Sequence, residues 1–358
     1  MRIALDATPL TLSSGGLPRY VTELSVALAR EFPDDTYYLL SDQPFPMPER
    51  APVNLIRGRQ PHTAAERRWW LWGIQHAIRQ TGAQVFHGTN FEVPYLGSTP
   101  AVLTIHDLSP WRESSWQIYD RNMDADRVRW RTPWLVRLRR ARMIVTVSEA
   151  VRREVIDHFG VSAERVHAVP LAASSHFRPV MSTSPPQKPF FLFVSTLEPR
   201  KNVASLVEGW RESRAATKAD LVIAGRNRAD FQEIPPCDGL HLLGEVPDEE
   251  LPQLYSDALA FVYPTHYEGF GLPVLEAMQC GCPVITSRDP AVTEVSGGAA
   301  IHASTPHEIA EAMCAIAENP RLRNVLSGCG LERASSFSWS RTARETHALY
   351  ASVVQGGG

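Results

Sequence analysis

Residues 259–281 read LAFVYPTHYEGFGLPVLEAMQCG, and they combine a strand, a glycine-containing loop and a helix. The apolar run LAFVYPT (259–265) predicts a buried strand. Pro273 suits the first turn of the helix expected in GLPVLEAMQC (271–280). Strand, loop and helix in this order form the repeating unit of an α/β sheet whose strands run parallel.

The same alternation runs through the rest of the chain. Short apolar or β-branched runs predict strands, and apolar residues at helical spacing predict helices. Further strands are predicted at 1–7, 84–88, 101–107, 143–148, 190–195, 220–225, 239–244, 282–287 and 299–303, and further helices at 17–32, 148–160, 202–213, 247–258 and 337–354. The fold class is therefore α/β, with doubly wound parallel sheets that carry helices on both faces.

The chain has 358 residues, too many for one ordinary hydrophobic core. SHFRPVMSTSPPQKP (175–189) is rich in serine and proline, lacks periodicity and predicts a linker. We expect a first domain over 1–177, a second over 178–336 and a closing helix and tail over 337–358. The two sheets would present their carboxyl ends to a central cleft, because open α/β sheets bind ligands at those ends.

Composition limits the class of protein. Hydrophobic residues make up 44% of the chain and charged residues 21%, which is typical of globular proteins. No apolar run approaches the roughly 20 residues that span a bilayer, and the first ten residues lack the apolar core of a signal peptide. We therefore expect a cytoplasmic location. The five cysteines are unclustered, which argues against disulfides or a zinc site, and a net charge of −3 argues against nucleic-acid binding.

Small and polar residues follow the predicted strands of the first half. Gly15 and Gly16 precede a helix, where their backbone can approach a ligand and free N–H groups suit an anion. His106 follows the last apolar residue of its strand, and His87 has the same placement. Each histidine could hydrogen-bond a sugar hydroxyl in an acceptor pocket. An ordinary tight turn and structural histidines remain the alternatives.

The first strand of the second half runs into Ser195-Thr196-Leu197-Glu198-Pro199-Arg200-Lys201-Asn202. Two adjacent cations beyond a strand end suit a diphosphate, which spreads charge over several oxygens. The alternative is a solvated Arg-Lys pair. Asn202 predicts the cap of the next helix. Three residues at two further strand ends could frame a nucleotide base: Gly225, Arg226 and Val246.

Two glutamates flank the loop of the opening stretch. Glu268 is predicted in the loop, and Glu276 in the first turn of the following helix, where the dipole favours a carboxylate. A carboxylate accepts hydrogen bonds well from paired hydroxyls such as those of ribose. The intervening residues could present backbone N–H groups to a sugar or a phosphate: Gly269, Phe270, Gly271 and Leu272.

These motifs resemble one family over essentially the whole chain. The motifs are GG-x-x-RY (15–20), VTVSEAVRREV (145–155), EPRKN (198–202), LGEVPDEELPQLYSDA (243–258) and EGFGLPVLEAMQCGCPVI (268–285). Their order is similar to that of the large retaining glycosyltransferase family 4. The resemblance implies the GT-B fold, with two Rossmann-like domains and a closing helix that crosses back to the first domain.

The resemblance also implies roles around a nucleotide-sugar donor. Glu276 would bind the ribose hydroxyls, and Glu268 would lie beside the transferred sugar. Residues 269–271 would supply backbone donors to that sugar. His106 would contact the sugar near the acceptor.

For the diphosphate, the resemblance implies that Arg200 and Lys201 hold it as it leaves. Gly16 would approach the same phosphates from the first domain. Many members have Gly-Arg where this chain has Ser195 and Thr196. One customary arginine is therefore missing, and Arg200 would substitute for it.

The family generally works without a metal or another cofactor, so neither is expected here. Asp124-Ala-Asp126 has the spelling of a metal-binding motif, but it lies in an arginine-rich helical stretch and is interpreted as solvated. Retention in the family is attributed to attack on the same face of the sugar that the diphosphate leaves. Cations and backbone N–H groups aimed at the diphosphate would then dominate catalysis.

GDP-mannose is the expected donor, because EGFGLP together with EPRKN is common among mannosyltransferases of polysaccharide assembly. A UDP-sugar is the alternative. The acceptor would be a saccharide or a lipid-linked saccharide. A non-catalytic carbohydrate-binding protein and a sugar-nucleotide epimerase are competing functions. A phosphorylase would need a lysine for pyridoxal phosphate, and the chain has only Lys188, Lys201 and Lys218.

The stretch 121–142 contains eight arginines, two aspartates and interleaved tryptophans, and RRWWLW (67–72) has a similar composition. Such segments suit an anionic membrane surface, so the protein could associate peripherally with the inner face of the plasma membrane. The alternative is an acceptor-domain surface whose tryptophans belong to the core.

Overall fold

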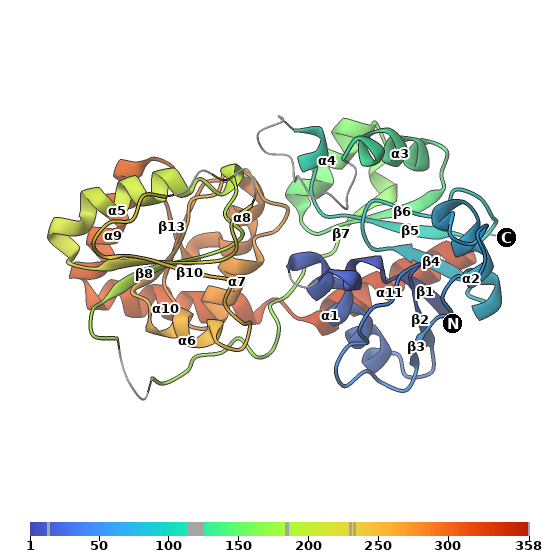
Figure 1. Ribbon diagram of the computed structural model, residues 1–358, viewed down its shortest axis with the longest axis horizontal. Helices are drawn as coiled ribbons and strands as arrows, with labels where there is room; N and C mark the ends of the chain where they lie inside the picture. The colour runs from blue at the N-terminus through green and yellow to red at the C-terminus, as the bar shows by residue number, and fades with distance from the viewer. Residues whose placement is uncertain (13–14, 113–124, 183–185, 229–230, 232–233, 357–358) are drawn as a thin grey trace. The chain divides into compact units, whose positions relative to one another are not determined.

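The computed structural model describes residues 1–12, 15–112, 125–182, 186–228, 231 and 234–356. It divides into two compact units (Figure 1). The first extends to Leu171 and also includes the segment that starts at Ser338; the second is Ala172–Phe337. The division after Leu171 lies a few residues before the predicted boundary at 177/178. The closing segment belongs to the first unit.

A seven-stranded sheet forms the centre of the first unit, and all its neighbouring strands pair in parallel. Its strands in spatial order are β3 (Leu55–Arg57), β2 (Thr36–Leu40), β1 (Arg2–Asp6), β4 (Val85–Gly88), β5 (Ala101–Ile105), β6 (Ala141–Thr146) and β7 (Val166–Ala168). The helices around it are α1 (Gly16–Glu31), α2 (Ile74–Thr81), α3 (Ala125–Arg137), α4 (Glu149–Phe159) and α11 (Trp339–Gln355) (Figure 1).

The second unit repeats this design around a six-stranded parallel sheet. Its strands in spatial order are β10 (Leu240–Gly244), β9 (Asp220–Ala224), β8 (Phe190–Val194), β11 (Ala260–Tyr263), β12 (Val284–Thr286) and β13 (Ile301–His302). Its helices are α5 (Val203–Thr217), α6 (Leu251–Asp257), α7 (Leu272–Gln279), α8 (Pro290–Ser296), α9 (Pro306–Glu318) and α10 (Pro320–Ser335). Each unit is thus a Rossmann-like layer structure, as predicted.

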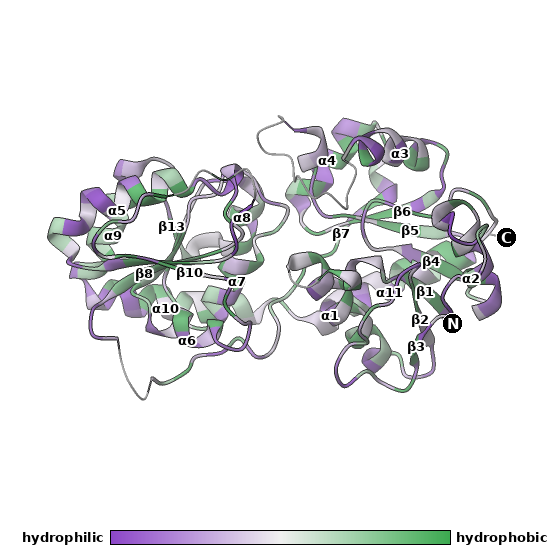
Figure 2. Ribbon diagram, in the orientation of Figure 1, coloured by the Kyte–Doolittle hydropathy of each residue, from purple (hydrophilic) through white to green (hydrophobic). Residues whose placement is uncertain are grey.

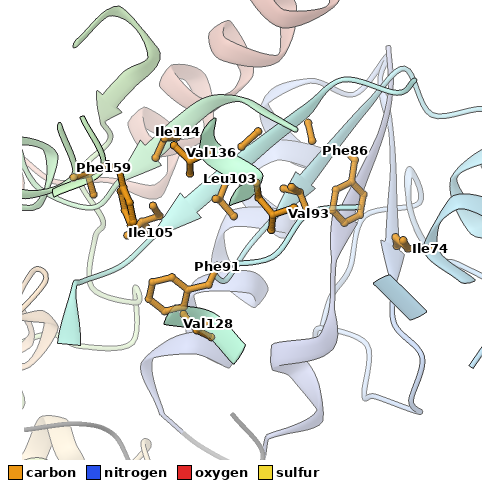
Figure 3. Close-up of a cluster of buried hydrophobic side chains, with 14 of the residues drawn as sticks. Ile74, Phe86, Phe91, Val93, Leu103, Ile105, Val128, Val136, Ile144 and Phe159 are labelled. Atoms are coloured by element: carbon orange, nitrogen blue, oxygen red, sulfur yellow. The ribbon is translucent and has the colours of Figure 1, made fainter. Parts of the chain in front are cut away.

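Apolar side chains on both faces of the strands explain this arrangement. Strands covered on both faces have nearly continuous apolar sequences, and Figure 2 shows the sheet strands largely in green. In the first unit, Phe86, Leu103 and Ile144 come from three adjacent strands and are fully buried. Val128 of α3 lies beside Phe91 in the same cluster (Figure 3).

The ends of the helices match the sequence-based predictions at some positions and differ at others. The Ser148 side chain caps α4, and Gly160 ends that helix with a positive φ of 61°, as predicted. Asn202 does not cap α5 with its side chain; its Nδ2 instead donates to the Pro264 carbonyl at 3.1 Å. The helix predicted from Pro247 begins only at Leu251.

The closing helix α11 packs within the first unit, mainly against α1. Ser338 caps it by accepting from the Arg341 N–H, and Thr342 Oγ1 donates to the Pro170 carbonyl at 2.6 Å. The His347 ring stacks on Phe32, with 3.5 Å between ring centroids. No helix within the described ranges is long and apolar enough to cross a bilayer.

Candidate functional site

β8 lies where the strand order of the second sheet reverses, with β9 on one side and β11 on the other. The loops that follow β8 and β11 therefore begin next to each other at the carboxyl edge of the sheet, one on each side of this reversal. Open α/β sheets bind ligands at such a point. These two loops carry residues 195–202 and 264–271, which include most of the predicted site.

The carboxylate of Glu268 is buried among donors from both loops. Its Oε1 accepts from Tyr263 Oη at 2.9 Å, from Thr265 Oγ1 at 3.0 Å and from Lys201 Nζ. Its Oε2 lies 3.3 Å from Nη1 of Arg200. Burial alone would raise the pKa of Glu268, but Lys201 and Arg200 outweigh it and lower the pKa to about 2. An ionised carboxylate cannot serve as a general acid near neutral pH.

Glu198 extends this arrangement on the other side of Arg200. Its Oε1 lies 2.6 Å from Arg200 Nε, and its Oε2 lies 3.1 Å from Arg228 Nη1. The five alternating side chains form what we call the buried charge cluster: Arg228, Glu198, Arg200, Glu268 and Lys201. Each of these side chains is at most 11% exposed. Burial and the neighbouring Arg200 lower the pKa of Lys201, and the two carboxylates oppose that change.

The buried charge cluster places two adjacent cations directly beyond β8. Arg200 also donates from Nη1 to the Tyr267 carbonyl at 3.0 Å, and Lys201 Nζ donates to Tyr263 Oη at 2.7 Å. Both head groups are thus held by several partners in one position. A fixed guanidinium beside a fixed ammonium can bind an anion with several oxygens, such as a diphosphate.

Glu276 lies deeper than the sequence predicted. It is the fifth residue of α7, so it belongs to the second turn and not to the first turn. Its carboxylate is 2% exposed and accepts from Tyr255 Oη at 3.4 Å. Gly271 precedes the helix with φ of 100°, and Leu272 begins it.

The loop between the glutamates is packed into the unit. Gly269 and Gly271 are buried. Phe270 is 4% exposed and meets Phe337 edge-to-face, with 5.9 Å between ring centroids. Phe270 can therefore offer a ligand its backbone but not its ring.

The residues predicted to frame a base lie at the ends of β9 and β10. Gly225 has φ of 141°, and a Cβ there would lie 1.8 Å from the Ser195 carbonyl oxygen. A close approach of two strand ends therefore explains this glycine. The Ser195 side chain hydrogen-bonds Tyr263, which links it to the buried charge cluster. Arg226 is exposed and Val246 is half-buried.

In the first unit, Gly15 has φ of 114° and precedes α1, which begins at Gly16; both glycines are exposed. His106 is half-buried after β5, and its Nε2 donates to the Thr89 carbonyl at 2.8 Å. Burial lowers the pKa of His106, so the ring is neutral near pH 7. In that tautomer Nδ1 is the acceptor of the ring.

His87 does not lie at the rim where the sequence placed it. It is fully buried, with Nδ1 2.6 Å from Tyr350 Oη and Nε2 2.7 Å from Thr104 Oγ1. Thr104 Oγ1 is also 2.9 Å from Tyr20 Oη. Burial lowers the pKa of His87 to about 3. His87 is a structural histidine that joins α11 to the sheet, so the acceptor-pocket hypothesis was wrong for this residue.

Of the two aspartates in Asp124-Ala-Asp126, only Asp126 lies within the described residues. Its side chain is 84% exposed and lies 3.6 Å from Arg129. Over the described ranges, no group of three His, Cys, Asp or Glu side chains could hold a metal ion.

Four members of the site were not identified from the sequence: Glu198, Arg228, Tyr263 and Thr265. Glu198 stands in the EPRKN motif, beside the two cations that were identified. Tyr263 and Thr265 lie at the end of an apolar strand, where they look like core residues. The signal available in the sequence was a polar residue at the carboxyl end of a predicted strand, where α/β sheets bind ligands.

The chain is similar to known glycosyltransferases over most of its length. Residues 14–174 match the family model described as Glycosyltransferase Family 4, and residues 179–330 match Glycosyl transferases group 1. The O-antigen chain mannosyltransferase B of Escherichia coli is 33% identical over 299 residues, which cover 76% of each chain. The MMP alpha-(1->4)-mannosyltransferase of Mycolicibacterium hassiacum is 30% identical over 260 residues, covering 66% of this chain and 63% of the relative. The structure of a sucrose-phosphate synthase from Thermosynechococcus elongatus superposes with a TM-score of 0.75, at 20% identity and 99% coverage of both chains.

Proposed function

Because the chain belongs to glycosyltransferase family 4 and has the GT-B fold, we propose that it transfers mannose from GDP-mannose. The acceptor is a saccharide or a lipid-linked saccharide in polysaccharide biosynthesis. The buried charge cluster carries this proposal, because it fixes two cations at the reversal of strand order. The relatives named above as mannosyltransferases favour mannose as the sugar.

Arg200 and Lys201 bind the diphosphate and stabilise the charge that develops as it leaves. Such preorganised donors commonly supply the largest part of the rate enhancement. Thr196 stands where many members of the family have an arginine, and Arg200 takes over the role of that arginine. Gly15 and Gly16 present backbone N–H groups to the same phosphates at the start of α1.

The remaining predicted residues bind the other parts of the donor. Glu276 accepts from the ribose hydroxyls, and residues 269–272 donate backbone N–H groups to the sugar. His106 accepts a hydrogen bond from a sugar hydroxyl at Nδ1. Ser195, Gly225, Arg226 and Val246 line the nucleotide.

Glu268 acts by fixing the two cations. Its low pKa and its four polar partners suit an anion that orients Lys201 and Arg200, beside the transferred sugar. The reaction retains the configuration at the anomeric carbon by attack from the face that the diphosphate leaves. Proton NMR of the first product formed tests this, and a product of inverted configuration would refute it.

We propose that the transfer needs no metal ion or other cofactor, because protein cations neutralise the leaving diphosphate. Turnover after dialysis against EDTA should equal turnover with added Mg²⁺ or Mn²⁺. Loss of activity that either metal restores would contradict this proposal.

The donor is tested by thermal shift and by turnover with GDP-mannose, UDP-glucose, and dTDP- and ADP-sugars. GDP-mannose should raise the melting temperature and support transfer of radiolabelled mannose to an acceptor. If UDP nucleotides alone stabilise the protein, the donor is a UDP-sugar and not GDP-mannose. Donor binding without transfer or hydrolysis, across acceptors, would identify a binding protein.

A lipid-linked acceptor is presented at a membrane. We propose that the enzyme acts at the cytoplasmic face of that membrane as a peripheral protein.

A further inference from the structure

The helix α3 has a buried face and an exposed face of unusual composition. Val128, Leu135 and Val136 are at most 5% exposed and pack into the core of the first unit (Figure 3). Thr132 on the same side donates to the Phe91 carbonyl at 3.1 Å. Because this face is buried, the opposite side of α3 faces the solvent.

The opposite face carries large apolar side chains. Trp130 is 74% exposed, Trp134 is 57% exposed and Leu138, just beyond the helix, is 65% exposed. Residues four apart on a helix lie on one stripe, and the Leu138 N–H continues the pattern by bonding the Trp134 carbonyl at 2.9 Å. Two indoles and a leucine thus form one exposed apolar stripe. The alternative that the tryptophans belong to the core is wrong for Trp130 and Trp134, whereas Trp69 and Trp70 of RRWWLW do pack in the core of the first unit.

A third exposed tryptophan belongs to a neighbouring element. Arg131 Nη1 donates to Tyr95 Oη at 2.8 Å, and the Tyr95 N–H donates to the Trp70 carbonyl at 3.0 Å. Through Tyr95, α3 is therefore connected to the short helix Trp69–Gly73. Trp72 in that helix is 52% exposed.

The charged groups around the stripe are mostly cationic. Arg137 and Arg139 are exposed at its carboxyl end. Arg140, by contrast, is half-buried and bonded to the Gly97 carbonyl at 2.8 Å, so it belongs to the fold. Asp126 is the acidic residue of the described helix. Cations beside exposed indoles match the anionic head groups and the interfacial zone of a bilayer.

We propose that Trp130, Trp134, Leu138, Arg137 and Arg139 form a docking surface for an anionic lipid bilayer. The indoles and the leucine enter the boundary between head groups and acyl chains, and the arginines contact lipid phosphates. This surface lies outside the buried charge cluster. Its function therefore does not depend on which sugar donor is used.

The experiment is flotation of the full chain with vesicles of phosphatidylcholine, with or without phosphatidylglycerol. Wild type should float with the anionic vesicles and remain largely unbound with the neutral ones. Trp130→Ser combined with Trp134→Ser should lower the bound fraction about tenfold. Arg137→Ser combined with Arg139→Ser should remove the preference for anionic lipid.

Matched controls come from other surfaces. Leu242 and Leu243 are 48% and 46% exposed on β10, and their double replacement by serine should leave flotation unchanged. Arg153→Ser combined with Arg321→Ser controls for general loss of exposed charge. Circular dichroism and nucleotide binding should match wild type in every variant, which separates docking from folding and from the donor site.

Two outcomes would overturn the proposal. One is equal flotation of wild type and the tryptophan variant. The other is wild type that fails to float but self-associates in sedimentation through the same tryptophans, because the surface would then bind a second copy of the chain.

Discussion

Nη1 of Arg228 lies 3.1 Å from Oε2 of Glu198, and both side chains are at most 8% exposed. The other oxygen of Glu198 holds Arg200, so one carboxylate compensates two buried guanidinium groups. Removing one partner of a buried ion pair is costly because the remaining charge stays in a medium of low dielectric constant. Glu198 thus links the stability of the second unit to the position of Arg200, which is proposed to bind the diphosphate.

We predict that Glu198→Gln lowers the free energy of unfolding by about 3 kcal/mol, because two buried arginines lose their shared carboxylate. Urea titration followed by circular dichroism measures the change. Glu345→Gln is the control, since Glu345 pairs with Arg341 on the exposed side of α11 and should cost at most about 1 kcal/mol. Equal losses in the two variants would show that burial of the Glu198 pairs contributes nothing.

Lys201→Gln should weaken the binding of GDP about tenfold and that of GMP much less, because Lys201 is assigned to the diphosphate. Isothermal titration calorimetry with both nucleotides measures the difference. Lys218, the exposed residue that ends α5, provides the matched control as Lys218→Gln. A common decrease for GDP and GMP would place Lys201 away from the second phosphate.

The two glutamates should separate in their kinetic effects. Glu268→Gln should lower turnover about a hundredfold with little change in GDP affinity, because Glu268 is assigned a place beside the transferred sugar, which GDP lacks. Glu276→Gln should mainly weaken donor binding, about tenfold, since a carboxylate accepts from both ribose hydroxyls. Turnover at saturating donor and calorimetry with GDP provide the two readouts. Equal loss of nucleotide affinity in both variants would contradict the division of roles.

His87 predicts a pH dependence of stability. Its pKa is about 3 in the folded protein, against an ordinary value of 6.5, so below pH 6.5 only the unfolded chain takes up this proton. Stability should then fall by about 1.4 kcal/mol per pH unit between pH 6.5 and pH 3 on account of this residue. His87→Gln keeps two hydrogen-bonding positions and should remove that part of the slope. Urea unfolding of both proteins at pH 4.5, 5.5, 6.5 and 7.5 is the measurement, and parallel profiles would refute the assignment.

The sequence predicted the central strands because their apolar runs are nearly continuous, as in β8 and β5. β3 and β7 have three residues each and include Arg57 and His167, so they lack the apolar run that marked the equally short β12. α10 was missed because Gly328 and Gly330 weaken its helical signal and few of its residues are buried. A strand or helix can be predicted from the sequence only when its own residues show an apolar pattern.

Residues of each loop in the site could be predicted separately, but the contacts between the loops could not. Each strand end showed its own polar residues, so Arg200, Lys201 and Glu268 could be identified. Their mutual contacts depend on the order of strands in the sheet, which places the loops of β8 and β11 together. The pairing of His87 with Tyr350 spans 263 residues, and no local pattern could reveal it.

The return of α11 to the first unit has a consequence for synthesis on the ribosome. Domains usually fold in order from the amino terminus, and here the second unit is complete once Phe337 has emerged. The first unit must still wait for Trp339–Gln355, which supplies Tyr350 to His87 and His347 to Phe32. The part of the chain made first is therefore the last to be completed, and until then its buried histidine has no tyrosine partner.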